Sequence, residues 1–326
     1  MFSFRNIHNV RLSPKHSQNE KYEFTGIAGL CDWQVIIDSQ IAELHVIGYL
    51  LHRNEIIHPR TIFLCTKGGF GIFDYFLARV LPKIHKQFVL ISGSADYTIP
   101  RQIDLRFPKF SLSQKITLEC IRSDSNLIAW FAENLDSYRP KMQFLPTGYT
   151  FDGSGAPISS VKTSDISIFE KNLKVFCGHR IRDGSQWDTR KKVSNLCKYE
   201  WSSLTTLIEK ELSLDEYIAN ILDHPFILCV EGGGLDPSPK AWLAMAAGSI
   251  PIIRRSPLAE AYEQVLPVSV IEDWEPSLLT SSVLEQWLEK LRPWFQNDDG
   301  RMKIEYRLSI HYWWHRILAE LDRGGA

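Results

Sequence analysis

Short apolar runs alternate along this chain with longer amphipathic stretches, and the alternation continues from about residue 60 to the C-terminus. Alternating strands and helices are typical of βα units that build a mainly parallel sheet. The first half is therefore predicted to be one α/β domain. Its predicted strands are Thr61–Thr66, Phe88–Ser92 and Met142–Leu145, and its predicted helices are Ile72–Ile84 and Leu127–Leu135.

The second half restarts the pattern after residues 151–165, a stretch rich in Gly, Ser and Pro that reads as a linker. We therefore predict an α/β fold with two Rossmann-like domains, residues 1–150 and 166–326, and a ligand cleft between them. A final helix at about residues 301–321 is expected to pack back on the first domain. The other elements predicted for the second half are strands at Leu173–Cys177, Phe226–Val230, Ser249–Ile253 and Leu266–Ile271, and helices at Trp187–Lys198, Ser213–Leu222, Pro239–Ala247 and Leu279–Leu291.

Composition narrows the class of protein. Apolar residues make up 44% of the chain and the net charge is −1, so nothing in the overall charge favours nucleic acid as a partner. The N-terminus lacks the apolar core of a signal peptide, and no run approaches the roughly 20 apolar residues that span a bilayer. The six cysteines have no C-x-x-C spacing. We expect a cytoplasmic protein with reduced cysteines, at most attached to the inner surface of a membrane.

The segment that carries the chemistry follows the predicted strand Phe226–Val230. It delivers an acidic residue, three glycines whose amides can approach a ligand closely, and the start of a helix. Ser238 is predicted to cap that helix, whose N-terminus favours an anion, and Lys240 adds a mobile positive charge. A tight turn that merely starts a helix is the alternative. The donor-binding residues predicted here are Glu231, Gly232, Gly233, Gly234, Asp236, Ser238 and Lys240.

This segment resembles the donor-site motif of GT-B glycosyltransferases, particularly the fucosyltransferase-like and exostosin-like families. The order Glu231, Asp236, Lys240, Gly248 and Pro251 matches theirs. The resemblance implies a nucleotide-sugar donor, a GDP- or UDP-sugar, with its diphosphate at the helix start and Lys240. It also implies that Glu231 accepts hydrogen bonds from the sugar hydroxyls.

The chain departs from these families at two positions. Fucosyltransferase-like sequences usually carry the ribose-binding carboxylate just before the basic residue, where this chain has Pro239, and exostosin-like sequences carry it shortly after, where this chain has Leu243. A non-catalytic nucleotide-sugar-binding or scaffold protein on a degenerate GT-B fold is therefore an alternative. A Rossmann-type oxidoreductase is disfavoured, because no G-x-G-x-x-G opens a helix.

A second basic cluster follows the predicted strand Leu173–Cys177. Gly178 and Arg180 lie in the loop after this strand, and Arg190 lies on the next helix. Many GT-B enzymes place an arginine here against the donor diphosphate, and the guanidinium fork suits bidentate phosphate contact. The resemblance therefore adds these three residues to the donor site. A solvated basic loop is the alternative.

The first half is expected to bind the acceptor, a glycan or glycolipid hydroxyl. Asp96 follows the strand Phe88–Ser92 and is the candidate general base, with an Asx-type turn as the alternative. Lys67, Gly69 and Asn134 are the other predicted acceptor-side residues.

Other candidates remain beside this set. His58 and His179 are weaker candidate bases, and no His, Asp or Glu cluster has metal-ligand spacing, so no metal or cofactor is expected. The C-terminal run Tyr306–His315 is densely aromatic. Packing between the domains is the favoured interpretation of this run, and peripheral membrane contact is the alternative.

Overall fold

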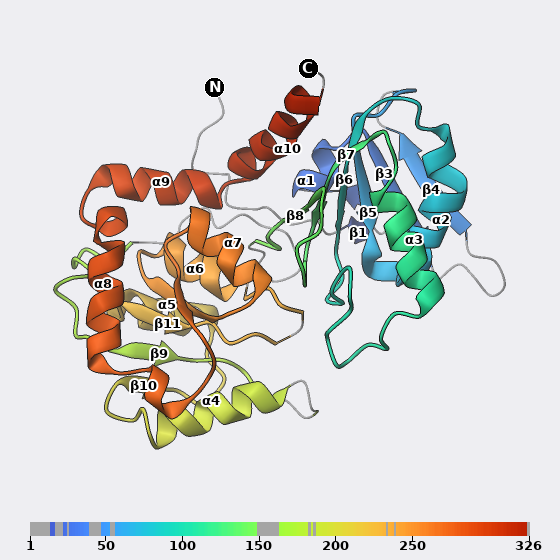
Figure 1. Cartoon of the computed structure of the whole chain (residues 1–326). Coiled ribbons are helices and arrows are strands. Elements are labelled where there is room, and N and C mark those ends of the chain that lie inside the picture. Colours follow the sequence, from blue (N-terminus) through green and yellow to red (C-terminus); the bar gives the residue numbers. More distant parts are fainter. Residues whose placement is uncertain are drawn as a thin grey trace. The chain divides into compact units, whose positions relative to one another are not determined.

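The structure is a computed structural model that describes residues 14–16, 22–24, 26–38, 47–52, 56–148, 163–181, 184, 187–232, 234–237 and 239–324. The chain divides into two compact units. The N-terminal unit contains the described residues up to Thr147 together with the final helix, which begins at Ile310. The C-terminal unit contains the described residues from Gly148 to Ser309. Figure 1 shows the final helix beside the blue and green strands of the N-terminal unit.

The N-terminal unit is built on a six-stranded sheet. Five strands are parallel and follow one another across the sheet in chain order, and β4 pairs antiparallel with β3 at one edge. The strands are β3 (Trp33–Asp38), β4 (Ile47–His52), β5 (Thr61–Cys65), β6 (Phe88–Gly93), β7 (Leu127–Ala132) and β8 (Met142–Phe144). A separate antiparallel pair is formed by β1 (Pro14–His16) and β2 (Tyr22–Phe24).

Helices cover both faces of this sheet (Figure 1). One face carries α2 (Gly71–Tyr75), which continues as a π-helical turn and a 3₁₀ turn to Lys83, and α3 (Leu112–Arg122). A Ser111 capping box starts α3. The other face carries α1 (Gly26–Leu30) and α10 (Ile310–Gly324), which contacts β6 and β7.

The C-terminal unit has a five-stranded, fully parallel sheet in the order β10-β9-β11-β12-β13. The strand order reverses between β9 and β11. In open parallel sheets a ligand binds outside the carboxyl ends of the strands at such a reversal. The strands are β9 (Val175–Cys177), β10 (Thr205–Leu207), β11 (Phe226–Leu228), β12 (Ile250–Arg254) and β13 (Ser269–Ile271).

Six helices surround this second sheet among the described residues. They are α4 (Asp188–Lys198), α5 (Leu214–Asp223), α6 (Lys240–Ala246), α7 (Pro257–Val265), α8 (Ser281–Phe295) and α9 (Asp298–Leu308). Side-chain caps start four of them, at Ser213, Ser256, Thr280 and Asn297. The predicted fold class, α/β with two Rossmann-like units, is confirmed.

One predicted element is wrong. Residues 127–135 were expected to form a helix, but Leu127–Ala132 is the strand β7, between β6 and β8. Five of its six residues are buried, so the run is apolar on both faces and has no periodicity that separates helix from strand. Trp130 is buried as expected, and its indole Nε1 donates to Ser92 Oγ at 2.8 Å.

The single terminal helix expected at residues 301–321 is also wrong. Ser309 has extended backbone (ψ 154°) and separates α9 from α10. Its amide and its hydroxyl both donate to Tyr306 O, at 3.0 and 2.6 Å, so local hydrogen bonds replace the helical ones. The break lets α9 stay with the C-terminal unit while α10 belongs to the N-terminal unit.

Candidate functional site

Lys240 begins α6 at the carboxyl edge of the C-terminal sheet. The residue as a whole is partly accessible, but its ammonium Nζ is buried and has no hydrogen-bond partner in the described part of the chain. Desolvation, and then the positive charge of Arg190, lower the pKa of Lys240 to about 7. The sequence predicted a mobile charge here. The structure instead shows a buried cation without a partner, which is costly unless an anion joins it.

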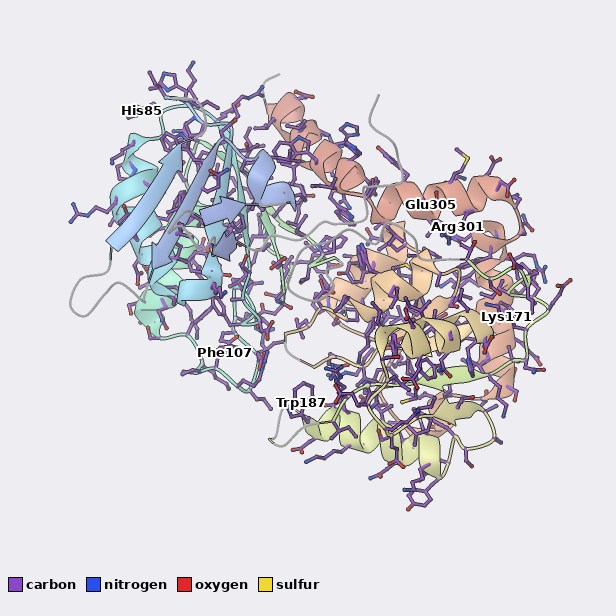
Figure 2. The ribbon with its side chains drawn as sticks, turned by 180° about the vertical axis from the view of Figure 1, so that it is seen from behind. His85, Phe107, Lys171, Trp187, Arg301 and Glu305 are labelled. Atoms are coloured by element: carbon purple, nitrogen blue, oxygen red, sulfur yellow. The ribbon has the colours of Figure 1, made fainter. Side chains whose placement is uncertain are left out.

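Arg190 on α4 reaches across the switch point from β9 to β11. Its guanidinium donates to Glu231 O at 3.2 Å, Arg180 O at 3.0 Å and Val230 O at 3.4 Å. It also lies over the Trp187 ring, 4.5 Å from the centroid. Figure 2 shows Trp187 at the beginning of α4. Arg190 therefore clamps the loop after β11, and its charge lies near enough to Lys240 to lower the lysine pKa.

Glu231 follows β11, as predicted, with its side chain 16% exposed. One carboxylate oxygen forms an ion pair with Arg254, and the other accepts from Trp274 Nε1 at 3.4 Å. Arg254 also lies 3.5 Å from Asp273. The predicted sugar-binding carboxylate is thus already engaged by the protein in the ligand-free chain.

Two glycines of the predicted donor site are required by close packing. A Cβ at Gly178 would overlap the ring of Phe176, and one at Gly232 would overlap the guanidinium of Arg190. Gly234 has φ +66°, which only glycine adopts readily. These positions therefore shape the edge of the sheet.

Two other predicted donor residues are engaged by other side chains of the protein. Asp236 is buried and accepts from Tyr262 Oη at 2.8 Å, so it fixes α7 to the loop before α6. Arg180 has an exposed side chain that pairs with Glu211 at 2.6 Å. The predicted residues Gly233 and Ser238 lie outside the described residues, so the expected Ser238 cap does too.

His179, a weaker candidate base, is buried between β9 and α4. Its Nε2 lies 2.9 Å from Ser194 Oγ and 3.0 Å from Arg190 O, and its Nδ1 lies 3.5 Å from Cys177 Sγ. The ring therefore connects β9 to α4, and its contacts indicate a structural role. His58, the other weaker candidate base, is exposed in the loop before β5.

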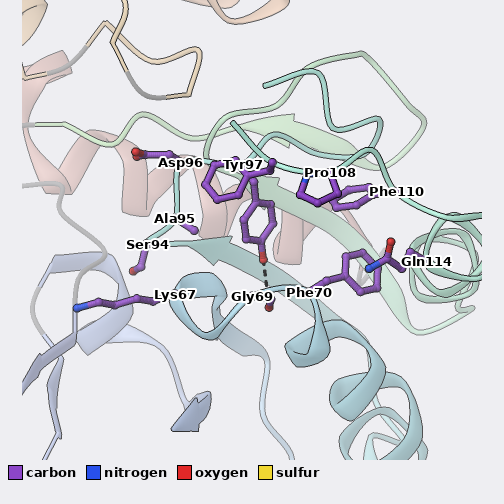
Figure 3. Close-up of a pocket in the computed structure, with 11 residues that line it drawn as sticks. Lys67, Gly69, Phe70, Ser94, Ala95, Asp96, Tyr97, Pro108, Phe110 and Gln114 are labelled. Carbon is purple, nitrogen blue, oxygen red and sulfur yellow. Dashed lines mark hydrogen bonds between the residues drawn. The ribbon is translucent and has the colours of Figure 1, made fainter. Parts of the chain in front are cut away.

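The N-terminal unit has a pocket of about 440 Å³ at the carboxyl edge of its own sheet. Three predicted residues line it: Lys67, Gly69 and Asp96. Figure 3 shows Lys67 and Asp96 toward one end of the pocket, with Phe70 and Phe110 toward the other. The pocket therefore combines a charged end with an aromatic end. Its remaining lining is Ser94, Ala95, Tyr97, Phe107, Pro108 and Gln114.

Aromatic contacts fix the shape of this pocket. Phe110 packs edge-on against Phe70 at 4.8 Å and against Tyr97 at 6.2 Å between ring centroids. The hydroxyl of Tyr97 donates to Gly69 O at 3.4 Å, and burial raises the pKa of this phenol. Tyr97 therefore stays protonated and acts as a fixed wall.

Asp96 is the most exposed carboxylate of the pocket, with 57% of its side chain accessible. Its Oδ2 lies 3.1 Å from Arg106 Nη1, and the same guanidinium pairs with Asp104 at 2.7 Å. Arg106 orients Asp96 from outside the pocket, and Lys67 Nζ contributes the opposite charge nearby.

Asn134, which was predicted on the acceptor side, is not among the residues that line the pocket. It is buried with φ +51°, and its amide Nδ2 donates to Ala95 O at 3.1 Å. The neighbouring Glu133 accepts from the Ser94 amide at 2.7 Å. Both side chains therefore fix the backbone of the 94–96 loop, which places Asp96 in the lining of the pocket.

Sequence reasoning missed two residues, Arg254 and Phe110. Arg254 ends the strand β12, whereas Phe110 lies in the long loop before the helix α3. The rule that placed Glu231 and Asp96 at the carboxyl ends of strands also applies to Arg254. Phe110 is distant in sequence from β6, and only the folded loop brings it to the pocket.

No three His, Cys, Asp or Glu side chains cluster as metal ligands among the described residues, so the prediction of no metal stays a prediction. Within the same residues, none of the helices is long and apolar enough to cross a membrane.

No protein-family model matches this sequence, and no curated protein matches it. Solved structures are similar in chain trace. Sucrose-phosphate synthase from Thermosynechococcus elongatus has a TM-score of 0.44 and 10% identity, over 82% of this chain and 72% of that one. TarM has a TM-score of 0.43 and 8% identity, over 80% of this chain and 54% of that one. At TM-scores and identities this low, the two similarities assign no activity to the chain.

Proposed function

We propose that this protein is a metal-independent glycosyltransferase that moves a sugar from a GDP- or UDP-sugar to a hydroxyl of a glycan or glycolipid acceptor. The donor binds at the carboxyl edge of the C-terminal sheet, and the acceptor binds in the pocket of the N-terminal unit. The Glu231–Pro251 motif order supports a fucosyltransferase-like or exostosin-like donor site.

The observation that carries this proposal is the ammonium of Lys240. A buried cation with no hydrogen-bond partner in the described chain lies at the topological switch point, where ligands of such sheets bind. Arg190 adds a second positive charge, close enough to lower the pKa of Lys240. A diphosphate that enters the site would accept a hydrogen bond from the ammonium and would neutralise both positive charges. The same two cations would stabilise the negative charge of the leaving diphosphate in a site without metal.

The acceptor side supplies the second half of the chemistry. Asp96 takes the proton of the acceptor hydroxyl, and Arg106 holds the carboxylate in orientation through its 3.1 Å contact. Lys67 stabilises the negative charge near the attacking oxygen. The aromatic end of the pocket holds the apolar part of the acceptor.

Calorimetric titration of the full chain with UDP, UMP, GDP, GMP and CMP, and with UDP-, GDP- and CMP-sugars, tests the proposal. We expect a diphosphate to bind more tightly than the corresponding monophosphate, because the second phosphate reaches Lys240. Absence of binding by every nucleotide in this panel, from a chain that unfolds cooperatively on heating, would overturn the proposal.

The engaged carboxylate of Glu231 favours a second candidate function, that of a non-catalytic nucleotide-sugar-binding protein. Because Arg254 and Trp274 already occupy Glu231, a sugar must displace one of them to be recognised. Transfer assays separate the two functions. Binding of nucleotide sugars with neither transfer nor hydrolysis, and no change in the Asp96→Asn variant, would favour the binding protein.

A further inference from the structure

Residues 101–116 form an exposed apolar and basic surface beside the pocket of the N-terminal unit. This docking segment runs from the loop after β6 into the first turns of α3. The described residues contain fourteen exposed large apolar side chains, and five of them lie within this short segment. Leu105 is 91% exposed and Leu112 is 75% exposed. The other three are Ile103, Phe107 and Ile116.

The charge of the docking segment is positive. Arg106 is paired with Asp104 and Asp96, so its charge is neutralised within the protein. Arg101, Lys109 and Lys115 are exposed, and none has an ion-pair partner among the described residues. The surface therefore joins exposed apolar side chains to three unpaired cations.

A second pocket, of about 420 Å³, adjoins the segment and is basic. Arg101, Lys115 and Ile116 line it, together with Arg122 and Arg139 from outside the segment. Arg122 is paired with Glu119, which also lines the pocket, so four basic side chains and one carboxylate leave the pocket positive. The pocket can accept a phosphate group next to the apolar side chains.

We infer that the docking segment binds an anionic lipid bilayer, with a headgroup phosphate in the basic pocket and the apolar side chains of Leu105 and Leu112 in the interface. Charge complementarity selects this occupant. A bilayer with anionic headgroups offers negative charge over an apolar layer, which is the arrangement that unpaired cations around exposed leucines require.

The pocket that holds Lys67 and Asp96 opens beside the same segment, because Phe107, Pro108 and Phe110 belong to both. An acceptor carried by a membrane lipid would enter this pocket from the docked face. This consequence for the acceptor rests on the proposed function, whereas binding to the bilayer does not.

Cosedimentation of the full chain with lipid vesicles tests the inference. We expect binding to phosphatidylcholine vesicles that contain phosphatidylglycerol, weak binding to phosphatidylcholine alone, and release by salt. Two variants remove the two contributions separately. The charge variant carries Arg101→Gln, Lys109→Gln and Lys115→Gln, and the apolar variant carries Leu105→Gln, Leu112→Gln and Ile116→Gln.

The charge variant should weaken partitioning on the anionic vesicles by on the order of 100-fold, because each of its three basic residues contributes about fivefold near an anionic surface. The apolar variant should weaken it by roughly 10- to 100-fold, because three apolar side chains no longer enter the interface. Matched controls change three exposed cations or three exposed large apolar residues elsewhere and should bind as the parent chain does. The charge control is Arg79→Gln, Lys83→Gln and Lys86→Gln, which lie before β6 at the opposite edge of the sheet. The apolar control is Ile57→Gln, Tyr199→Gln and Met302→Gln, all of them exposed side chains.

Equal vesicle binding by the parent chain, the variants and the controls would overturn the inference. So would a dimer in sedimentation equilibrium that only the apolar variant dissociates, because a second copy would then be the occupant. The headgroup part of the inference would also be overturned if inorganic phosphate abolished vesicle binding while an equal ionic strength of sodium chloride did not. The basic pocket would then be a site for free phosphate. Calorimetry with UDP and GDP on the same variants should be unchanged, so failure of the donor site and failure of docking are distinguishable.

Discussion

The carboxyl edges of the two sheets occupy equivalent positions in their units, but they are built differently. At the edge of the C-terminal sheet, charged side chains bind other groups of the protein. Arg190 clamps three backbone carbonyls and Arg254 pairs with Glu231, which leaves Lys240 as the buried cation without a partner. The edge of the N-terminal sheet instead keeps a pocket of about 440 Å³ with aromatic walls.

This difference indicates how each edge selects a ligand. A buried unpaired cation discriminates by charge, because only an anion compensates for its desolvation. An aromatic pocket discriminates by shape and apolar area, and its polar groups fix orientation. The two edges thus match the two halves of a sugar transfer, a charged donor and a hydroxyl acceptor with an apolar portion.

The largest effect is expected at Asp96, the proposed general base. Asp96→Asn removes the proposed base and keeps the side-chain volume, so the kcat of sugar transfer should fall by about 10²- to 10⁴-fold. Nucleotide binding measured by calorimetry should be unchanged. Steady-state transfer assays on the purified chain provide the measurement.

Asp104→Asn is the matched control for this variant, because Asp104 shares Arg106 with Asp96. If the control lowers kcat as much as Asp96→Asn does, both act by loosening Arg106, and Asp96 is a positioning residue. Transfer at the parental rate in Asp96→Asn would remove Asp96 from the mechanism.

A smaller effect is expected at the charged edge. Lys240→Met removes the ammonium and should weaken binding of UDP or GDP by on the order of 100-fold, as expected for loss of a charge-assisted hydrogen bond. The same change should raise the free energy of unfolding of the ligand-free chain by about 1 to 4 kcal/mol, because a buried unpaired charge is removed. Calorimetry and thermal unfolding measure the two effects.

Lys171→Met is the matched control for Lys240→Met. Lys171 Nζ is also buried without a hydrogen-bond partner in the described chain, and desolvation lowers its pKa. It precedes β9, at the opposite edge of the same sheet, and Figure 2 shows it far from Trp187. Nucleotide affinity should therefore be kept. Equal loss in both variants would mean that Lys240 acts only through stability.

The pH dependence should be intermediate in size. The native pKa of Lys240 is about 7, whereas an unfolded lysine titrates near 10.4, so between these values the unfolded chain binds more protons. The contribution of Lys240 to the stability of the ligand-free chain therefore rises from about pH 7 to about pH 10 and is lowest below pH 7. A bound diphosphate favours the charged ammonium, so affinity should fall by up to about tenfold per pH unit as the pH rises above about 7.

Titrations in two buffers with different ionisation enthalpies measure the proton taken up on binding. Uptake should be present in the parent chain and absent in Lys240→Met. Uptake of the same size in both chains would assign the proton to another group.

The smallest effect is expected at the aromatic edge. Phe107→Ala removes a ring that lines the pocket and is 38% exposed, so the KM for the acceptor should rise by about three- to tenfold with little change in kcat. Leu105→Ala, two residues away and outside the lining, is the control for kinetics in solution. A KM shift of equal size in both variants would contradict a specific role for the pocket wall.

Periodicity and turn chemistry predicted much of the C-terminal unit. The strand that begins at Phe226, the helix near Ser213 and the helix near Pro239 were all predictable from local residues. The N-terminal unit was less readable. The β7 run is buried almost throughout and carries no helical or strand period, and the Ser309 break lies within an amphipathic pattern that continues across it.

For the site, too, some features were predictable from the sequence and others were not. The sequence by itself determined that Glu231, Lys240 and Asp96 follow buried strands, because a polar residue after an apolar run must reach the edge of a sheet. Only the tertiary structure decided what each of them contacts. Arg190 and Arg254 come from other βα units, and their contacts arise from strand order, which no local pattern contains. The ammonium of Lys240 lacks a hydrogen-bond partner for the same reason, because strand order brings the charges of Arg190 and Glu231 near it without placing an acceptor within hydrogen-bond distance among the described residues.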